Sequence, residues 1–239
     1  MDQNIEPSEQ IFFETKLPLS KATKEKLVHF LAIVLETNQS LNLTAITDFN
    51  EGLVKHLYDS LAICAFPEFD SAISIIDIGS GGGFPVVPLA IAFPEKNLHS
   101  LDSTQKKVNF QKHSAETLQL ANFIGIWGRA EELGHDSRYR ETFDIVTARA
   151  VSQINVLLEI TVPFAKVGGF LVFYKGPDYQ SEINNASNAE RHLGVALERV
   201  IPYTLPQQFG QRCLVVYKKI AATSAKYPRK PGIPQKKPL

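Results

Sequence analysis

The apolar residues near the start of the chain recur at the spacing of an amphipathic helix. They stand at positions i, i+3, i+4, i+7 and i+8 and are Leu27, Phe30, Leu31, Val34 and Leu35. Ser20 or Thr23 is suited to cap this helix, because a hydroxyl oxygen can accept a hydrogen bond from an N–H group of the first turn. The polar triplet at 38–40 interrupts the pattern, so we expect the helix to end there.

A second helical pattern follows, for which Asp48 or Asn50 is the candidate cap. Its apolar face carries Leu53, Val54, Leu57, Tyr58 and Leu61. The opposite face carries His56, Asp59 and Ser60, which helical spacing brings together. This polar face either covers a functional site or forms a hydrogen-bond network that holds the helices to the rest of the fold. We expect residues 1–70 to form a helical N-terminal extension.

After residue 67 the pattern changes to short β-branched and apolar runs, which are typical of buried strands. Five runs are separated by helix-compatible stretches and cover residues 73–78, 97–101, 123–127, 143–147 and 170–174. This alternation predicts an α/β domain over 71–220, with a doubly wound, mostly parallel sheet. Two further runs, near 199–205 and 213–217, are too close together for a crossover helix. They should form an antiparallel hairpin at one sheet edge.

The last 19 residues, 221–239, differ from both preceding parts. They contain four prolines, no acidic residue and five cationic residues, which are Lys226, Arg229, Lys230, Lys236 and Lys237. Because proline disfavours helices and sheet interiors, we expect this basic tail to form no regular element and to run extended over the surface.

Charge is balanced over the whole chain but unevenly distributed. The 239 residues contain 25 Lys plus Arg and 25 Asp plus Glu, for a formal net charge of zero. This balance argues against a uniformly basic nucleic-acid-binding protein. Residues 1–14 nevertheless carry Asp2, Glu6, Glu9 and Glu14 without a base, whereas the last 22 residues carry seven bases without an acid. A local basic surface is therefore compatible with the neutral composition.

Several classes of protein are disfavoured by the sequence. No apolar stretch approaches the roughly 20 residues that a membrane span needs, and the acidic, polar start lacks the features of a secretory signal. Cys64 and Cys213 stand alone, and the six His and two Cys never cluster at the spacing of zinc ligands. We expect a cytoplasmic protein that binds no metal.

A glycine-rich loop directly follows the first predicted strand, at the end of the sheet where open α/β folds bind ligands. Residues 77–85 read DIGSGGGFP, and such glycines let a ligand approach the backbone closely. The ligand could be a dinucleotide or S-adenosylmethionine. A dinucleotide loop prefers G-x-G-x-x-G, but Phe84 and Pro85 stand where the third glycine belongs. Asp102, at the end of the second strand, is placed to accept hydrogen bonds from ribose hydroxyls.

The D-x-G-x-G-x-G form of the loop resembles that of class I S-adenosylmethionine-dependent methyltransferases, whose seven-stranded sheet also ends in an antiparallel hairpin. Segments from about residue 27 to 239 resemble one family among these enzymes, the glucose-inhibited division protein B family. They are 42–44, 55–61, 79–85, 101–103, 129–132, 148–150, 175–176 and 227–234. Each segment alone is unspecific, whereas their order together with the tail is specific. Gly82 departs from the family, in which many members have proline there.

The resemblance implies methyl transfer from S-adenosylmethionine to N7 of a guanine in bacterial small-subunit (16S) ribosomal RNA, either naked or in an assembling subunit. The cofactor-binding residues it implies are Gly79, Gly81, Gly83, Phe84, Asp102, Ala130, Glu131 and Arg149. Arg149, Lys175 and His56 are candidates for positioning the substrate. Arg149 could instead form a salt bridge with a nearby acid, and Lys175 could be a solvated lysine. The five cations of the tail are candidate RNA contacts, and we expect a monomer.

The residues that are missing agree with this chemistry. Methylation of an exocyclic amine commonly uses an (Asn/Asp)-Pro-Pro-(Tyr/Phe) motif after the fourth strand, where this chain reads TARA at 147–150. Methylation of cytosine C5 needs a nucleophilic cysteine, but neither cysteine is beside the loop. Guanine N7 has a free lone pair and no proton, so it needs positioning rather than a base. A small-molecule methyltransferase and a non-catalytic ribosome assembly factor remain as alternatives.

Three residues near the predicted site have simpler interpretations. Trp127 could stack on a base, but it ends an apolar strand run, so we expect it to pack in the core. Arg138 and Arg140 lie among acidic residues and are expected to belong to a solvated loop.

Overall fold

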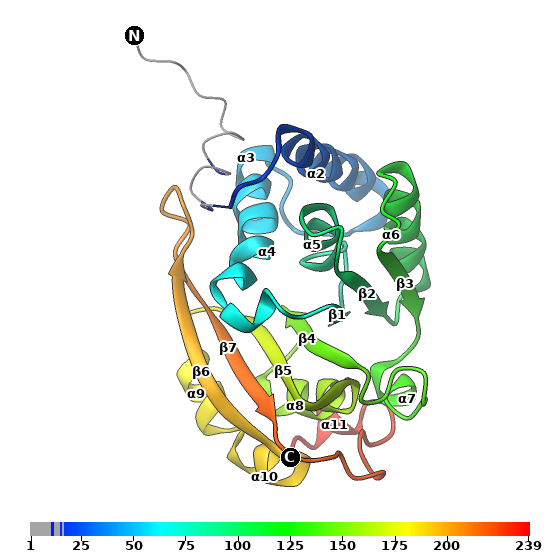
Figure 1. Ribbon diagram of the computed structural model, residues 1–239, viewed down its shortest axis with the longest axis vertical. Helices are drawn as coiled ribbons and strands as arrows, with labels where there is room; N and C mark the ends of the chain where they lie inside the picture. Colours follow the sequence, from blue (N-terminus) through cyan, green and yellow to red (C-terminus); the bar gives the residue numbers. More distant parts are fainter. Residues whose placement is uncertain (1–10, 12–14, 16) are drawn as a thin grey trace.

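The computed structural model describes residues 11, 15 and 17–239, so the acidic residues Asp2, Glu6, Glu9 and Glu14 lie outside the described part of the chain. Its centre is one seven-stranded sheet with the order β3-β2-β1-β4-β5-β7-β6 (Figure 1). The strands are β1 (Ser74–Ile78), β2 (Asn97–Asp102), β3 (Phe123–Trp127), β4 (Phe143–Arg149), β5 (Ala165–Lys175), β6 (Val195–Thr204) and β7 (Gln211–Lys219). Strands β1 to β5 are parallel, and β7 is antiparallel to both of its neighbours. The predicted α/β fold and its antiparallel edge hairpin are confirmed.

Helices cover both faces of the sheet. They are α2 (Lys21–Leu41), α3 (Phe49–Gly52), α4 (Asp59–Leu61), α5 (Val86–Ala92), α6 (Gln105–Thr117), α7 (Ala130–Leu133), α8 (Ile154–Thr161), α9 (Tyr179–Asn184), α10 (Ser187–Leu193) and α11 (Ile233–Lys236). A π-helical turn, Leu53–Tyr58, links α3 to α4, and short 3₁₀ turns occupy Ala62–Ala65, Pro67–Phe69 and Val162–Phe164. Helix α2 packs against α5 and α6, whereas α8 contacts β4, β5 and α10.

Alternate residues of the strands enter different hydrophobic cores, as the two-residue period of a strand requires. Ile75 and Val172 pack with the N-terminal helices and α5. Their neighbours point to the opposite face, where Ile76 belongs to a cluster near α7 and Leu171 to one around α8. The chain leaves β1 toward β2 and β3 and then returns to β4 on the other side of β1. The carboxyl ends of β1 and β4 thus flank the switch point at which such sheets bind ligands.

The N-terminal helices follow the predicted caps. The hydroxyl of Ser20 accepts a hydrogen bond from the Thr23 N–H at 3.1 Å, and the Asp48 carboxylate accepts one from the Glu51 N–H at 2.8 Å. The expected end of the first helix is wrong, because α2 continues through the polar triplet to Leu41. The Asn38 side chain does not interrupt the helix but accepts hydrogen bonds from the N–H groups of the following loop.

The expectation that the basic tail forms no regular element and runs extended over the surface is wrong. The tail contains the short helix α11, which packs on α8, and it lies beside α7 and α8 (red in Figure 1). Tyr227 and Pro234 are buried. The tail is therefore a packed part of the fold, held by contacts with residues far away in the sequence.

The expected environments of two side chains, Trp127 and Arg140, are wrong. Trp127 is 57% exposed, because β3 is an edge strand, and its indole N–H donates to the Ser103 carbonyl at 3.1 Å. Arg140 does not belong to a solvated loop, since its guanidinium donates to backbone carbonyls that include Thr223 (2.7 Å) and Tyr227 (3.0 Å) of the tail. Arg138 does stay exposed, paired with Asp136.

Within the described residues, no helix combines the length and the apolar character that a membrane crossing requires. The same residues contain no group of three or more His, Cys, Asp or Glu side chains that could hold a metal ion.

Candidate functional site

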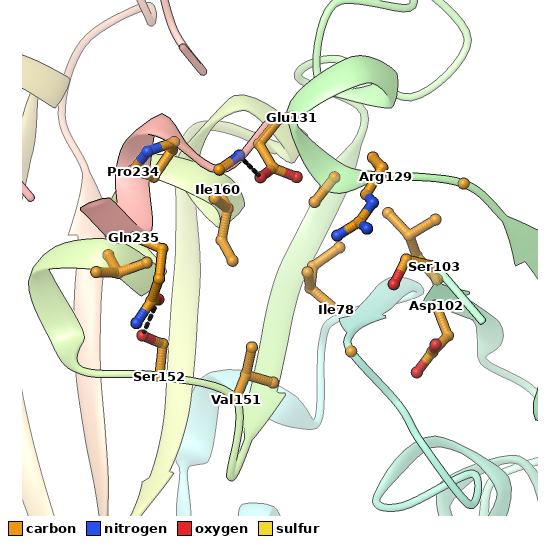
Figure 2. A pocket seen from close by; sticks show the side chains of 16 residues that line it. Ile78, Asp102, Ser103, Arg129, Glu131, Val151, Ser152, Ile160, Pro234 and Gln235 are labelled. Carbon is orange, nitrogen blue, oxygen red and sulfur yellow. Dashed lines mark hydrogen bonds between the residues drawn. The ribbon is translucent and has the colours of Figure 1, made fainter. Parts of the chain in front are cut away.

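A cavity of about 380 Å³ opens at the carboxyl ends of β1, β2 and β3 (Figure 2). Its volume lies within the range of small-molecule sites. Four of the predicted cofactor residues line it, namely Gly79, Asp102, Ala130 and Glu131. Further lining comes from Ile78, Leu101, Ser103, Gly128, Arg129, Val151, Ser152, Val156, Ile160, Gly232, Pro234 and Gln235.

The glycine loop reaches the cavity through Gly79. Its backbone φ of +78° is a left-handed conformation that favours glycine, and a Cβ at this position would meet Val151 at 2.6 Å. Gly83 has φ +93°, but a Cβ there would meet the core side chains Val87 and Phe30 at 2.9 and 3.3 Å. Gly79 thus lets the backbone line the cavity. Gly83 lets the loop pack closely against α5 and α2.

Asp102 is held rigidly at the cavity by the backbone. Its Oδ2 accepts a hydrogen bond from the Gly81 N–H at 2.9 Å, and its Oδ1 accepts one from the Thr104 N–H at 2.8 Å. The Gln111 amide donates to the Gly81 carbonyl at 2.7 Å and fixes the loop from below. A carboxylate offers about four acceptor positions, so Asp102 keeps capacity to accept hydrogen bonds from a ligand.

The third strand contributes the opposite side of the cavity. Ala130 and Glu131 form the first turn of α7, directly after β3. Ala130 is buried and apolar, and the Glu131 Oε1 accepts a hydrogen bond from the Gly232 N–H of the tail at 3.1 Å. This contact brings the tail to the edge of the cavity.

A second cluster of predicted residues lies behind the loop, away from the cavity lining. The His56 and Phe84 rings are stacked, with centroids 4.2 Å apart, and the Arg149 guanidinium lies 5.4 Å from the Phe84 centroid. Arg149 forms an ion pair with Asp59 at 2.9 Å, and the Tyr203 hydroxyl donates to the other Asp59 oxygen at 2.6 Å. The acid with which Arg149 forms the salt bridge considered in the sequence analysis is therefore Asp59.

This cluster also supplies the hydrogen-bond network that we expected as one interpretation of the polar helix face. His56 Nε2 and the Thr44 hydroxyl are 2.8 Å apart, and the Tyr174 hydroxyl donates to the Ser60 carbonyl at 2.9 Å. The network joins the N-terminal helices to β4, β5 and β6, with Asp59 as its centre.

Burial sets the protonation of two groups near the loop. Burial, reinforced by the positive charge of Arg149, lowers the pKa of His56 from 6.5 to about 3, so the imidazole is neutral at neutral pH. Burial also raises the pKa of Asp77 to about 7, against the opposing hydrogen bond from the Thr147 hydroxyl at 2.7 Å. Neither group is a freely accessible acid or base.

The predicted RNA-binding cations fall into two groups. Lys175 forms an ion pair with Glu182 at 2.6 Å and is mostly buried, and Arg229 forms one with the fully buried Glu159. The other four cations of the tail, Lys226, Lys230, Lys236 and Lys237, are exposed.

Sequence reasoning missed the residues that close the cavity. Val151 and Ser152 lie just after the carboxyl end of β4, which flanks the switch point of the sheet. Their place after this strand could have identified them as ligand-binding candidates. Gly232 lies within 227–234, a segment that resembles the family, but no feature of the sequence placed Gly232 or Gln235 at the cavity, because they reach it only through the fold of the tail.

Comparisons with known proteins agree with this architecture. The sequence profile of the GidB family, described as rRNA small subunit methyltransferase G, matches residues 23–208. A protein named ribosomal RNA small subunit methyltransferase G from Brevibacillus brevis is 42% identical over 93% of this chain and 94% of its own length. One with the same name from Carboxydothermus hydrogenoformans is 40% identical, over 95% of this chain and 97% of its own.

Solved structures share the fold at lower identity. Cofactor-bound Rv0187 from MTB has a TM-score of 0.60 at 17% identity and covers 91% of this chain and 99% of its own. An O-methyltransferase from Bacillus cereus in complex with SAH has a TM-score of 0.56 at 17% identity, over 80% of this chain and 91% of its own. Because the family profile matches residues 23–208 and the relative from Brevibacillus brevis is 42% identical over 93% of the chain, the chain belongs to the GidB family of small-subunit ribosomal RNA methyltransferases.

Proposed function

We propose that this protein transfers the methyl group of S-adenosylmethionine to N7 of a guanine in 16S ribosomal RNA. The observation that carries the proposal is the cavity at the carboxyl ends of β1 to β3, with Asp102 and Gly79 in its wall, in a member of this family. The cofactor supplies a methyl group bonded to a positively charged sulfur. The protein has to bind this group and orient the guanine toward it.

The residues around the cavity fit S-adenosylmethionine. Leu101, Ala130 and Ile160 offer apolar surface for the faces of an adenine ring. The Asp102 carboxylate, fixed by two backbone N–H groups, is suited to accept hydrogen bonds from the ribose hydroxyls. Gly79 permits a close approach to the backbone that a larger residue would prevent. We assign these residues to the nucleoside part of the cofactor.

The groups near the loop suit a reaction that removes no proton. Guanine N7 attacks with its own lone pair, so no side chain has to act as a general base. His56 is neutral and buried, and Arg149 is neutralised by Asp59. We propose that these residues shape the loop through Phe84, and that catalysis rests on holding the two reactants in line.

RNA contact is assigned to the exposed lysines of the tail, namely Lys226, Lys230, Lys236 and Lys237. Lys175 and Arg229 are engaged with buried or half-buried acids and therefore hold the fold. We propose that the enzyme acts as a monomer on ribosomal RNA in the cytoplasm, naked or within an assembling small subunit.

A methylation assay tests this function directly. The purified protein and labelled S-adenosylmethionine are incubated with naked 16S RNA, and separately with small ribosomal subunits, both from cells that lack this gene. Borohydride reduction and aniline cleavage then locate N7-methylguanine by primer extension. We expect one new methylated guanine in at least one substrate. Cofactor binding without methylation of either would favour a non-catalytic assembly factor, and methylation of metabolites alone would favour a small-molecule enzyme.

A further inference from the structure

The tail forms one wall of the candidate cofactor cavity. Gly232, Pro234 and Gln235 line it, beside Glu131 at the start of α7 and across the cavity from Asp102 and Ser103 (Figure 2). These residues lie beyond 23–208, the part of the chain that the family profile matches. A segment outside that region therefore contributes directly to the site.

The tail is fixed to the domain just before it reaches the cavity. Arg229 donates two side-chain hydrogen bonds to Glu159, whose side chain is fully buried on α8. Arg140 donates to the Tyr227 carbonyl, and the Tyr227 side chain is buried. Paired buried charges are costly to separate. The position of the following residues is therefore set by the fold.

Two hydrogen bonds then hold the wall itself in place. The Gly232 N–H donates to Glu131 Oε1 at 3.1 Å, and the Ser152 hydroxyl donates to Gln235 Oε1 at 2.9 Å (Figure 2). Because its oxygen is used as an acceptor, the Gln235 amide group is oriented, and its two N–H donors are left without a protein acceptor among the described residues. Gln235 is exposed at the edge of a cavity whose wall is partly polar and partly apolar, and an oriented amide donor in that position is a typical polar contact for a ligand.

We infer that residues 232–235 form the outer wall of the cofactor site and that Gln235 is a cofactor-binding residue, with its amide N–H groups donating to the nucleoside end of the cofactor. This inference rests on the proposed function for the identity of the cofactor. The nucleoside end is indicated because Gln235 shares its cavity with Asp102 and Ala130, which we assign to ribose and adenine. The tail thereby serves the cofactor through its inner surface, while its lysines stay exposed.

Calorimetric titration of the full-length protein tests the inference. The probes are S-adenosylhomocysteine and 5′-methylthioadenosine, which keeps the nucleoside but lacks the amino-acid part. Loss of one hydrogen bond costs the free energy of about a tenfold change in Kd. We therefore expect Gln235→Leu to raise the Kd of both probes by about tenfold. Gln180→Leu, an exposed position on α9 outside the cavity, is the matched control and should bind as wild type does.

The outcomes separate this inference from the proposed function. If the wild-type protein binds neither probe, the cofactor assignment fails. If it binds both but Gln235→Leu binds them equally well, only the role of Gln235 is overturned. A loss for S-adenosylhomocysteine without a loss for methylthioadenosine overturns the assignment to the nucleoside end. The urea midpoint of each variant reports whether the fold is intact, and Ser152→Ala, which frees the Gln235 amide without removing it, should give a smaller loss.

Discussion

Asp102 shows how a single side chain gains its role from the backbone around it. Both carboxylate oxygens accept hydrogen bonds from N–H groups, one from the glycine loop and one from the turn after β2. The carboxylate is therefore oriented before any ligand arrives, which reduces the entropy cost of binding. The hydrogen bond from the Gly81 N–H also holds the glycine loop in place, so the position of the loop depends on the Asp102 carboxylate.

Asp102→Asn should weaken S-adenosylhomocysteine binding by about 10- to 100-fold, the range expected when a hydrogen bond to a charged group is lost. The new amide would also direct N–H donors toward the Gly81 or Thr104 N–H. Isothermal titration calorimetry measures the loss. Asp136→Asn, which removes a partly exposed carboxylate that is paired with Arg138 and lies outside the cavity lining, is the control and should bind normally. Equal affinities for Asp102→Asn and wild type would contradict the role of this carboxylate.

His56 makes a prediction about pH. Its pKa is about 3 in the folded protein and near 6.5 when unfolded, so unfolding takes up a proton between these values. Stability should therefore fall as the pH drops through this window, by about 1.4 kcal/mol between pH 7.5 and 5.5. Urea unfolding of wild type and His56→Gln measures it. The variant should lack this part of the pH dependence, since His99 and Asp77 titrate in both proteins and cancel in the difference. Parallel pH profiles would show that His56 is not buried in its neutral form.

At the level of elements, the ion pair between Arg229 and the buried Glu159 is one of the contacts that hold the tail. Arg229→Ala would leave the buried Glu159 carboxylate with only the backbone N–H of residue 229 as a partner and without a counter-charge, which should lower the free energy of unfolding by about 3 kcal/mol. The double variant Arg229→Met, Glu159→Leu should recover part of this loss, because it removes both charges but also the acceptor of the residue 229 N–H. Chemical denaturation measures both, and Arg138→Ala, which breaks an exposed pair, should stay near wild type. If Arg229→Ala unfolds at the same denaturant concentration as the wild-type protein, the Arg229–Glu159 ion pair does not hold the tail.

The elements also show which features a sequence can reveal. The strands, the caps at Ser20 and Asp48 and the edge hairpin depend on local periodicity and neighbouring residues, and these predictions are confirmed. Four cavity-lining residues followed from the loop, from strand ends and from family resemblance. The fold of the tail depends instead on partners such as Arg140 and Glu159, which are 70 or more residues away. No local pattern reports such contacts, so the tail was predicted as extended.

The exposure of Trp127 was missed for a related reason. An apolar run predicts a strand, but its side chains are covered only if another element lies over them. Strand β3 is at the edge of the sheet, and its Ile124 and Trp127 side chains are 52% and 57% exposed. Strand order is a property of the whole sheet, which the run itself does not contain.

At the scale of the molecule, the net charge is zero, but the charges are unevenly distributed along the chain, and the last 22 residues carry seven bases and no acid. Of the seven bases in the last 22 residues, Lys219 and Arg229 are neutralised by Glu141 and Glu159. The exposed cations of the tail are the four lysines at 226, 230, 236 and 237, on the segment that also lines the cavity. Positive charge is thus concentrated beside the proposed cofactor site, where an RNA phosphate backbone would be attracted.

This arrangement predicts how RNA affinity responds to salt. A lysine that neutralises a phosphate contributes about 0.7–0.9 to the slope of log K against log salt concentration. Lys230→Ala and Lys237→Ala should each weaken binding of a 16S RNA fragment and reduce the slope by about that amount. Filter binding or fluorescence anisotropy at several salt concentrations measures both. Lys166→Ala, an exposed lysine at the opposite end of the sheet that pairs with Asp144, is the matched control. Unchanged slopes for the tail variants, or an equal reduction for Lys166→Ala, would show that RNA contacts the molecule elsewhere.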